Sequence, residues 1–229
     1  MANENPPPKS LPEILPVFPL TGVLLLPGMP LPLHIFEPRY RNMVEDALKA
    51  ERVFGVIQPF VPQQDNQPSS GAEQENPELY KVGCAGYIAK WEKSPDGRFA
   101  IELKGLNRFR AEEELPLHRG YRRVKANYTE FPDSSLAKDW KCDRGALVQA
   151  LDAYAKNRGL QVQMKQLNRF EDLDLINLLG ISLPFHPAEK QALLEASSLR
   201  DRETLLINLL RFGIGHDPSG SDIPPRTLN

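Results

Sequence analysis

The chain has 229 residues, of which 41% are hydrophobic, so it is long enough for one large domain or two small ones. Its 28 lysines and arginines nearly balance 30 aspartates and glutamates, and no basic block is present, so we expect no nucleic-acid partner. Neither a secretory signal nor an apolar run near the ~20 residues of a membrane span occurs, so we expect a cytoplasmic protein with no membrane partner.

The first part of the chain alternates bulky apolar residues with prolines. Proline has no backbone N–H to donate, so strands here must be short, kinked or at the edge of a sheet. We expect a flexible tail over residues 1–12, strands over 14–20 and 31–35, and a helix over 39–50 with Pro38 in its first turn.

The next segment, up to residue 131, is mostly typical of strands. A polar stretch over 60–78, rich in Gln, Asn, Ser and Pro, is instead predicted to be a mobile loop. The turn Ser94-Pro95-Asp96-Gly97 indicates a hairpin, because its glycine can supply a positive φ. Many short strands with one helix predict a closed or nearly closed barrel; the expected strands cover 53–58, 82–92, 98–103, 106–115 and 121–131.

Beyond residue 131 the hydrophobic period becomes helical. Asp133 and the two serines after it can cap a helix whose buried face includes Trp140 and Leu147, and Gly159 can end that helix. Further helices are expected over 170–179, from about 187, and over 203–212. We therefore predict an α+β protein with a β-rich subdomain over 13–131, a helical subdomain over 132–213 and a flexible tail over 214–229.

Five short motifs occur along the chain: Phe-Pro-Leu at 18–20, Pro-Gly at 27–28, Ile-Phe-Glu-x-Arg-Tyr at 35–40, Gly-x-x-Arg at 105–108 and Glu-Lys-Gln-x-Leu-Leu-Glu at 189–195. These motifs resemble the amino-terminal, substrate-recognition domain of the Lon proteases. The resemblance extends from about residue 13 to 212. It implies a pseudo-barrel similar to the PUA fold, followed by helices, and a role in recognising polypeptide.

The catalytic motifs of a Lon protease do not occur in this sequence. There is no Gly-Lys-Ser or Gly-Lys-Thr to form a phosphate-binding loop. The nearest likeness to the Lon nucleophile is Ser219, in a Gly/Pro/Ser-rich tail without a scaffold for a base. We therefore expect no enzyme activity and no cofactor, and the resemblance implies a stand-alone form without ATPase and protease modules.

Metal binding is not expected either. The cysteines Cys84 and Cys142 are far apart in sequence, and none of the four histidines has the spacing of a metal site. We interpret Glu37, Arg39 and Arg108 structurally: Glu37 satisfies donors at a helix start, Arg39 pairs with a carboxylate, and Arg108 tethers a turn.

Aromatic and apolar residues are the candidates for binding. Tyr87 and Trp91 lie four positions apart on a predicted strand and hence on one face, and Leu183 and Phe185 flank a proline between two helices. Each is either part of the core or part of an exposed apolar surface that holds hydrophobic or unfolded polypeptide.

Two functions of different class remain open. One is a non-catalytic recognition protein, acting as an adaptor to a separate protease or chaperone. The alternative is a small-molecule- or nucleotide-binding protein, or an enzyme, that uses a cleft between the barrel and the helices.

Overall fold

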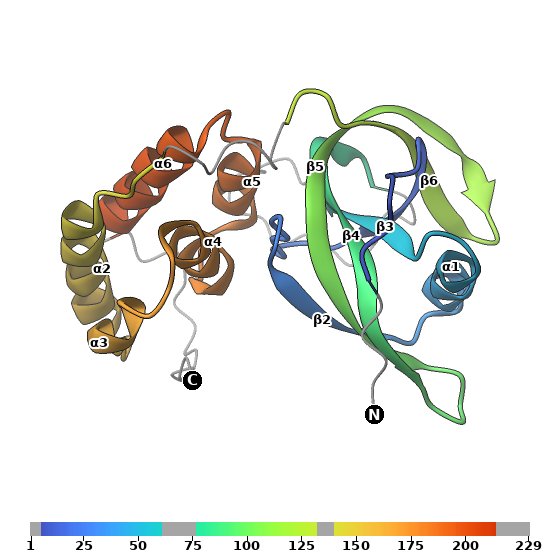
Figure 1. Cartoon of the computed structure of the whole chain (residues 1–229), viewed down its shortest axis with the longest axis horizontal. Helices are drawn as coiled ribbons and strands as arrows, with labels where there is room; N and C mark the ends of the chain where they lie inside the picture. The colour runs from blue at the N-terminus through green and yellow to red at the C-terminus, as the bar shows by residue number, and fades with distance from the viewer. Residues whose placement is uncertain (1–5, 61–76, 132–139, 214–229) are drawn as a thin grey trace, which may run out of the picture. The chain divides into compact units, whose positions relative to one another are not determined.

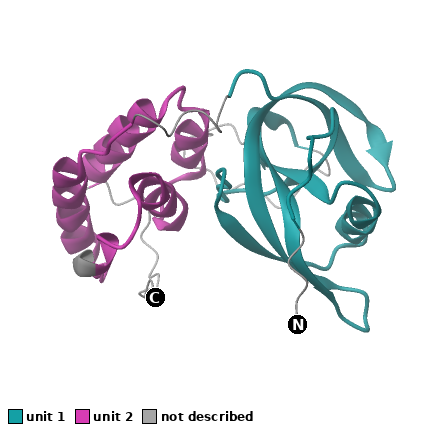
Figure 2. Ribbon diagram, viewed as in Figure 1, with its two compact units in different colours: residues 1–133 teal, residues 134–229 magenta. Residues whose placement is uncertain are grey.

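The computed structural model describes residues 6–60, 77–131 and 140–213 (Figure 1). The chain divides into two compact units, residues 1–133 and 134–229 (Figure 2). Four predictions fall wholly or largely outside the described residues: the start of the N-terminal tail, the loop over 60–78, the helix cap at 133–135, and the C-terminal tail with Ser219. The predicted α+β class is confirmed.

The first unit is a barrel of mixed strands with one helix, α1 (Pro38–Lys49). The strands are β1 (Ile14–Pro19), β2 (Pro30–Ile35), β3 (Val53–Pro59), β4 (Leu79–Lys93), β5 (Phe99–His118) and β6 (Tyr121–Asn127). Strand β1 runs parallel to β3, and antiparallel pairing continues from β3 through β4, β5 and β6 back to β1. This circuit closes the barrel, as predicted from the sequence, and β2 is added beside the first half of β5.

Strand β5 is one continuous strand, although the sequence predicted two strands separated near Lys104. Its first half pairs with β2 and its second half with β6. The register shifts near Gly86 on β4 and near Glu112 on β5, and such bulges bend and twist a sheet. The sequence pattern placed Gly105 between two strands, but in the structure this residue lies inside β5.

Gly105 allows the loop before β2 to lie directly on the sheet. Its N–H donates to Met29 and its carbonyl accepts from Gly28, both at 2.9 Å. A Cβ at this position would lie 2.1 Å from the carbonyl oxygen of Leu26. The close approach of two backbones therefore requires glycine here.

The inner face of the barrel forms a hydrophobic core with contributions from all strands of the closed circuit. Leu11, which falls within the predicted tail, packs against this core. The buried members are Leu15, Val17, Val53, Ile57, Leu79, Ala85, Tyr87, Ala89, Phe109, Val124 and Ala126.

Buried arginines connect the barrel to the segments around it. Arg108 is fully buried and its guanidinium lies 4.3 Å from the ring centroid of Phe131, which agrees with a structural role. Arg122 donates two hydrogen bonds of 2.6 Å to the Glu114 carboxylate and a third to the carbonyl of Pro77. Close to Pro77, the Phe60 N–H donates to Glu78, so both ends of the segment between β3 and β4 are fixed.

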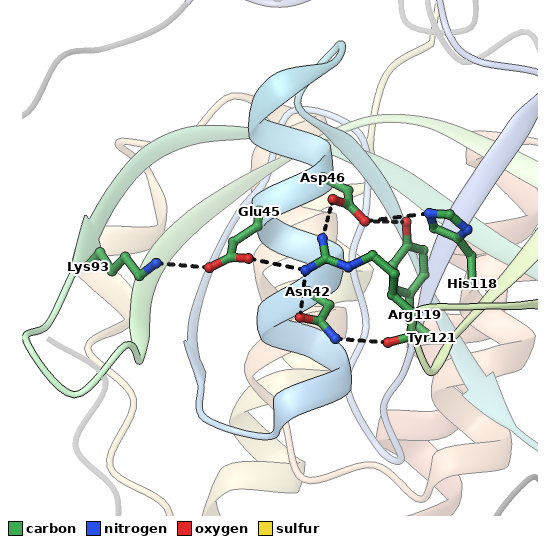
Figure 3. A network of polar contacts seen from close by, with 7 residues as sticks. All are labelled: Asn42, Glu45, Asp46, Lys93, His118, Arg119 and Tyr121. Atoms are coloured by element: carbon green, nitrogen blue, oxygen red, sulfur yellow. Dashed lines mark hydrogen bonds and ion pairs between the residues drawn. The ribbon is translucent and has the colours of Figure 1, made fainter.

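A polar network connects α1 to the turn between β5 and β6 (Figure 3). Arg119 has a φ of 47°, a left-handed conformation that is uncommon for residues other than glycine. Its guanidinium donates to Asn42 at 3.0 Å and to Asp46, while its carbonyl accepts from Asn42 at 2.9 Å. The Tyr121 hydroxyl donates to Asp46 at 3.1 Å. These contacts with α1 compensate for the strained conformation of the turn.

The second unit consists of the helices α2 (Arg144–Arg158), α3 (Met164–Leu167), α4 (Asp172–Ser182), α5 (Pro187–Glu195) and α6 (Leu199–Phe212). Several of their boundaries differ from those predicted. Trp140 precedes α2, because Asp143 caps that helix by accepting from the Ala146 N–H. Helix α4 continues through Gly180, since a helix interior tolerates glycine at a modest cost.

Two neighbouring residues of α6 organise this unit. Arg202 is buried and donates to the Leu193 carbonyl and the Asn177 side chain, both at 3.1 Å, which connects α6 to α5 and α4. The Glu203 carboxylate accepts from the Trp140 indole at 3.2 Å and from the Asp143 N–H at 2.5 Å. The residues that lead into α2 are therefore attached to α6.

We predict that Gly105→Ala destabilises the protein by roughly 1–3 kcal/mol, the range for forcing extra volume into a packed site. The added Cβ would collide with the Leu26 carbonyl, and backbone cannot move aside as a side-chain end can. Urea denaturation monitored by circular dichroism measures the change. Gly145→Ala in α2 is the control, because its Cβ meets nothing nearer than 3.4 Å and helix propensity favours alanine. Equal effects of the two changes would contradict the close approach at Gly105.

A second prediction concerns alkaline pH. Burial and the hydrogen bond to Asp46 raise the pKa of Tyr121 to about 12, from 10.0 for a free tyrosine. Between these values the folded protein keeps a proton that the unfolded chain releases, so this contribution to stability is complete below pH 10 and is lost as the pH rises toward 12.

Tyr121→Phe should therefore reduce the number of protons released on unfolding in this interval by about one. Denaturant titrations at several pH values give this number from the slope of stability against pH. Burial also raises the pKa of Tyr40 and of Tyr154, so a residual slope is expected in the variant. An unchanged slope would show that Tyr121 ionises normally.

Candidate functional site

Of the four residues predicted to form a binding surface, Trp91 is exposed and the other three are buried. Trp91 lies near the end of β4 with 44% of its surface exposed, and its ring centroid is 6.2 Å from that of Phe99. Tyr87 and Trp91 belong to the barrel unit, whereas Leu183 and Phe185 belong to the helical unit.

The prediction that Tyr87 and Trp91 share a face is wrong, because a bulge interrupts β4 between them. Tyr87 is paired with Lys104 and Trp91 with Ile101, and partners three positions apart on β5 lie on opposite faces. The register shifts between Ile88 and Lys90, which reverses the alternation. Tyr87 consequently belongs to the barrel core.

Of the two alternatives left open for Leu183 and Phe185, the structure shows burial in the core. Leu183 directly follows α4, where its N–H donates to the Leu179 carbonyl at 3.1 Å. The Phe185 ring packs 6.1 Å from the ring of Tyr154 on α2, between centroids. Both side chains are buried, so the link between α4 and α5 contributes to the core rather than to a contact surface.

Trp91 ends a row of apolar side chains that crosses three strands. The strand register pairs Trp91 of β4 with Ile101 of β5, and Ile101 with Leu33 of β2, which places all three on one face. Ile101 is buried, Leu33 is partly buried, and Trp91 is the most exposed of the three. Such a row can contact an apolar side chain of a partner through the indole.

Charged residues surround this row without lying in it. Lys93 is on the same face as Trp91, and its ammonium lies 5.0 Å from the ring centroid of Phe99. On the opposite face, Lys90 pairs with Glu102 at 3.3 Å. The arrangement offers aromatic and cationic contacts.

The sequence interpretation missed three exposed apolar residues of the barrel unit, Ile14, Phe36 and Leu117. Phe36 directly follows β2, in which Leu31, Leu33 and Ile35 point to the more buried face. Extending this alternation by one residue would have placed Phe36 on the exposed side. No comparable signal exists for Leu117, near the end of β5.

The side chains of Glu37, Arg39 and Tyr40 at the start of α1 contact one another. Arg39 donates to Glu37 at 3.0 Å, as expected, and its guanidinium lies 4.7 Å from the Tyr40 ring centroid. The Glu37 side chain makes no capping hydrogen bond, so the prediction that it satisfies helix donors is wrong. Burial raises the pKa of Tyr40, whose ring packs 4.4 Å from Phe18.

The potential metal ligands and the Cys142 thiol are the candidates for reactive chemistry in the part of the chain that the structure describes. Within residues 6–60, 77–131 and 140–213 there is no group of three or more His, Cys, Asp or Glu side chains able to hold a metal ion. Burial, reinforced by Glu203, raises the pKa of Cys142 to about 12, so this thiol is a poor nucleophile. None of the described helices is both long enough and apolar enough to cross a bilayer.

Comparison with solved structures agrees with this architecture. The Lon N-terminal domain protein from Xanthomonas campestris aligns with a TM-score of 0.58 and 23% identity, over 84% of this chain and 96% of that one. The N-terminal domain of the Mycobacterium avium complex Lon protease aligns with a TM-score of 0.57 and 18% identity, over 86% and 97%. At these identities the comparison establishes the fold.

Sequence comparison adds the family. The Lon protease of Cytophaga hutchinsonii is 26% identical over 211 residues, which are 88% of this chain and 24% of that protein. That of Anaeromyxobacter dehalogenans is 27% identical over 216 residues, with 88% and 23% covered. The chain thus spans about a quarter of the length of these curated relatives. The family model of the ATP-dependent protease La (LON) substrate-binding domain matches residues 14–211, most of the chain, and the chain therefore belongs to that family.

Proposed function

We propose that this protein recognises exposed hydrophobic segments of unfolded polypeptide and that Trp91 anchors them. Family membership supports a role in substrate binding. The exposed indole at the end of an apolar row is the observation that carries the proposal. Tryptophan is enriched at binding hot spots because it buries a large apolar surface and loses little side-chain entropy.

The surroundings of Trp91 suit recognition that tolerates different sequences. Each nearby ammonium already has a carboxylate partner, Glu102 for Lys90 and Glu45 for Lys93. A partner segment therefore meets an apolar contact without a demand for a particular charge. We further propose that the bound polypeptide is presented to a separate protease or chaperone in the cytoplasm.

Replacing the anchor should weaken binding without unfolding the barrel. We predict that Trp91→Ala reduces affinity for a fluorescein-labelled, unstructured peptide containing Phe and Leu by ~1–2 kcal/mol, the scale of losing an aromatic contact. Fluorescence anisotropy measures the affinity, and urea denaturation measures stability.

Two control variants separate binding from folding. Phe60→Ala removes an aromatic of similar exposure, 42%, and should leave affinity unchanged. Phe60 directly follows β3 and packs 5.2 Å from Tyr80, between ring centroids, at the end of β4 opposite to Trp91. Phe185→Ala should lower stability by ~3–5 kcal/mol, since this ring is buried. If Trp91→Ala affects stability as strongly as Phe185→Ala, or affects affinity no more than Phe60→Ala, Trp91 is not the anchor. Binding of a small ligand in place of any peptide would favour the alternative function.

We also propose that the chain itself is not catalytic. Purified protein should neither hydrolyse ATP nor degrade casein, because the sequence contains no phosphate-binding loop and no serine in a recognisable catalytic setting. Activity that persists through stringent purification and is lost in Ser219→Ala would overturn this.

A further inference from the structure

The tip of the β4–β5 hairpin, where Trp91 lies, extends beyond strand β3. Pairing between β3 and β4 reaches Val53 and Tyr87, and one more hydrogen bond joins Ile88 to the Arg52 carbonyl. Among the described strands, β5 is the one partner of β4 from Lys90 to Lys93. The edge of β4 that faces away from β5 is therefore not paired with any described strand at Trp91, so contacts with other elements must fix its position.

We infer that Glu45 of α1 is a positioning residue for Trp91, acting through Lys93. The ammonium of Lys93 donates to a Glu45 carboxylate oxygen at 2.9 Å, and the same ammonium lies over the Phe99 ring. Phe99 in turn packs against Trp91. One chain of contacts thus leads from the helix to the indole.

Helix α1 also contacts the hairpin at its turn. Gly97 has a φ of 82°, and a Cβ at this position would lie 2.2 Å from a terminal nitrogen of Arg41. Arg41 and Glu45 are one helical turn apart on α1, so they face the hairpin together. The helix therefore fixes both the turn and the strand that carries Trp91.

The carboxylate of Glu45 is itself held by a second hairpin. Its other oxygen lies 3.5 Å from the Arg119 guanidinium, in the turn between β5 and β6 (Figure 3). Arg119 is bound in turn by Asn42 and Asp46 of α1. The hydrogen bond from Lys93 lowers the pKa of Glu45, in keeping with a contact made by the carboxylate form. Glu45 thus joins two hairpins to a single helix.

A second ion pair on the same strand provides a matched control. Lys90 and Glu102 pair across β4 and β5 on the face opposite to Trp91, with 38% of each side chain exposed. The side chains of Lys93 and Glu45 are exposed to 43% and 30%. The two pairs are similar in type and exposure. Contacts with Phe99 connect the Lys93 pair to Trp91.

The inference rests on the proposed function for its biological meaning, but its test does not require peptide binding. The chain contains two tryptophans, so full-length protein labelled with 5-fluorotryptophan gives two fluorine resonances. The Trp91 resonance is assigned as the one that disappears in Trp91→Phe. We expect Lys93→Met and Glu45→Gln each to shift and broaden it, and to leave the Trp140 resonance unchanged.

The same variants are then titrated with the labelled peptide. Lys93→Met and Glu45→Gln should weaken binding about two- to fivefold, the scale of losing one exposed ion pair. Lys90→Met should change neither the resonance nor the affinity. If Lys93→Met perturbs the Trp91 resonance no more than Lys90→Met does, Glu45 does not position Trp91. If the wild type binds no peptide while the resonance responds as expected, the proposed function fails and the positioning role stands.

Discussion

Closure of the barrel depends on the ability of one strand to pair with different neighbours along its length. The first half of β5 pairs with β2 and the second half with β6, while β4 runs along its other side. A flat strand could not meet both neighbours, so the backbone has to bend, and register shifts supply the bend. Gly105 then lets the loop before β2 cover the sheet at close range. The position of α1, which follows β2, depends on this arrangement.

The features that were predictable from the sequence are those that depend on neighbouring residues. Alternation of period two indicated most strands, proline at the start of α1 and α5 marked their first turns, and the change to a helical period indicated the helical part. The length of β5 was not predictable, because an irregularity in the alternation of apolar and polar residues looks the same as a gap between two strands. The start of α2 was also misplaced: serines near residue 134 compete as caps with Asp143, and only the fold selects among them.

The candidate site was also predictable only where it depends on neighbouring residues in the sequence. Trp91 was identified as a potential contact from its residue type and position. Its supposed partners were not exposed: the bulge before Lys90 turns Tyr87 into the core, and packing against Tyr154 buries Phe185. The contacts of Glu45 with Lys93 and Arg119 join residues 48 and 74 positions apart, which no local pattern encodes. Each of these outcomes is decided by tertiary structure.

Contacts at both ends of the connection between β3 and β4 fix the residues that flank it. Arg122 holds the Pro77 carbonyl from within the sheet, and the backbone of Phe60 pairs with that of Glu78. The cost of closing a longer connection at such a base grows only with the logarithm of its length, about 0.6 kcal/mol for each doubling. The length of this connection therefore contributes little to the stability of the barrel, because the pairing of β3 with β4 sets the strand register.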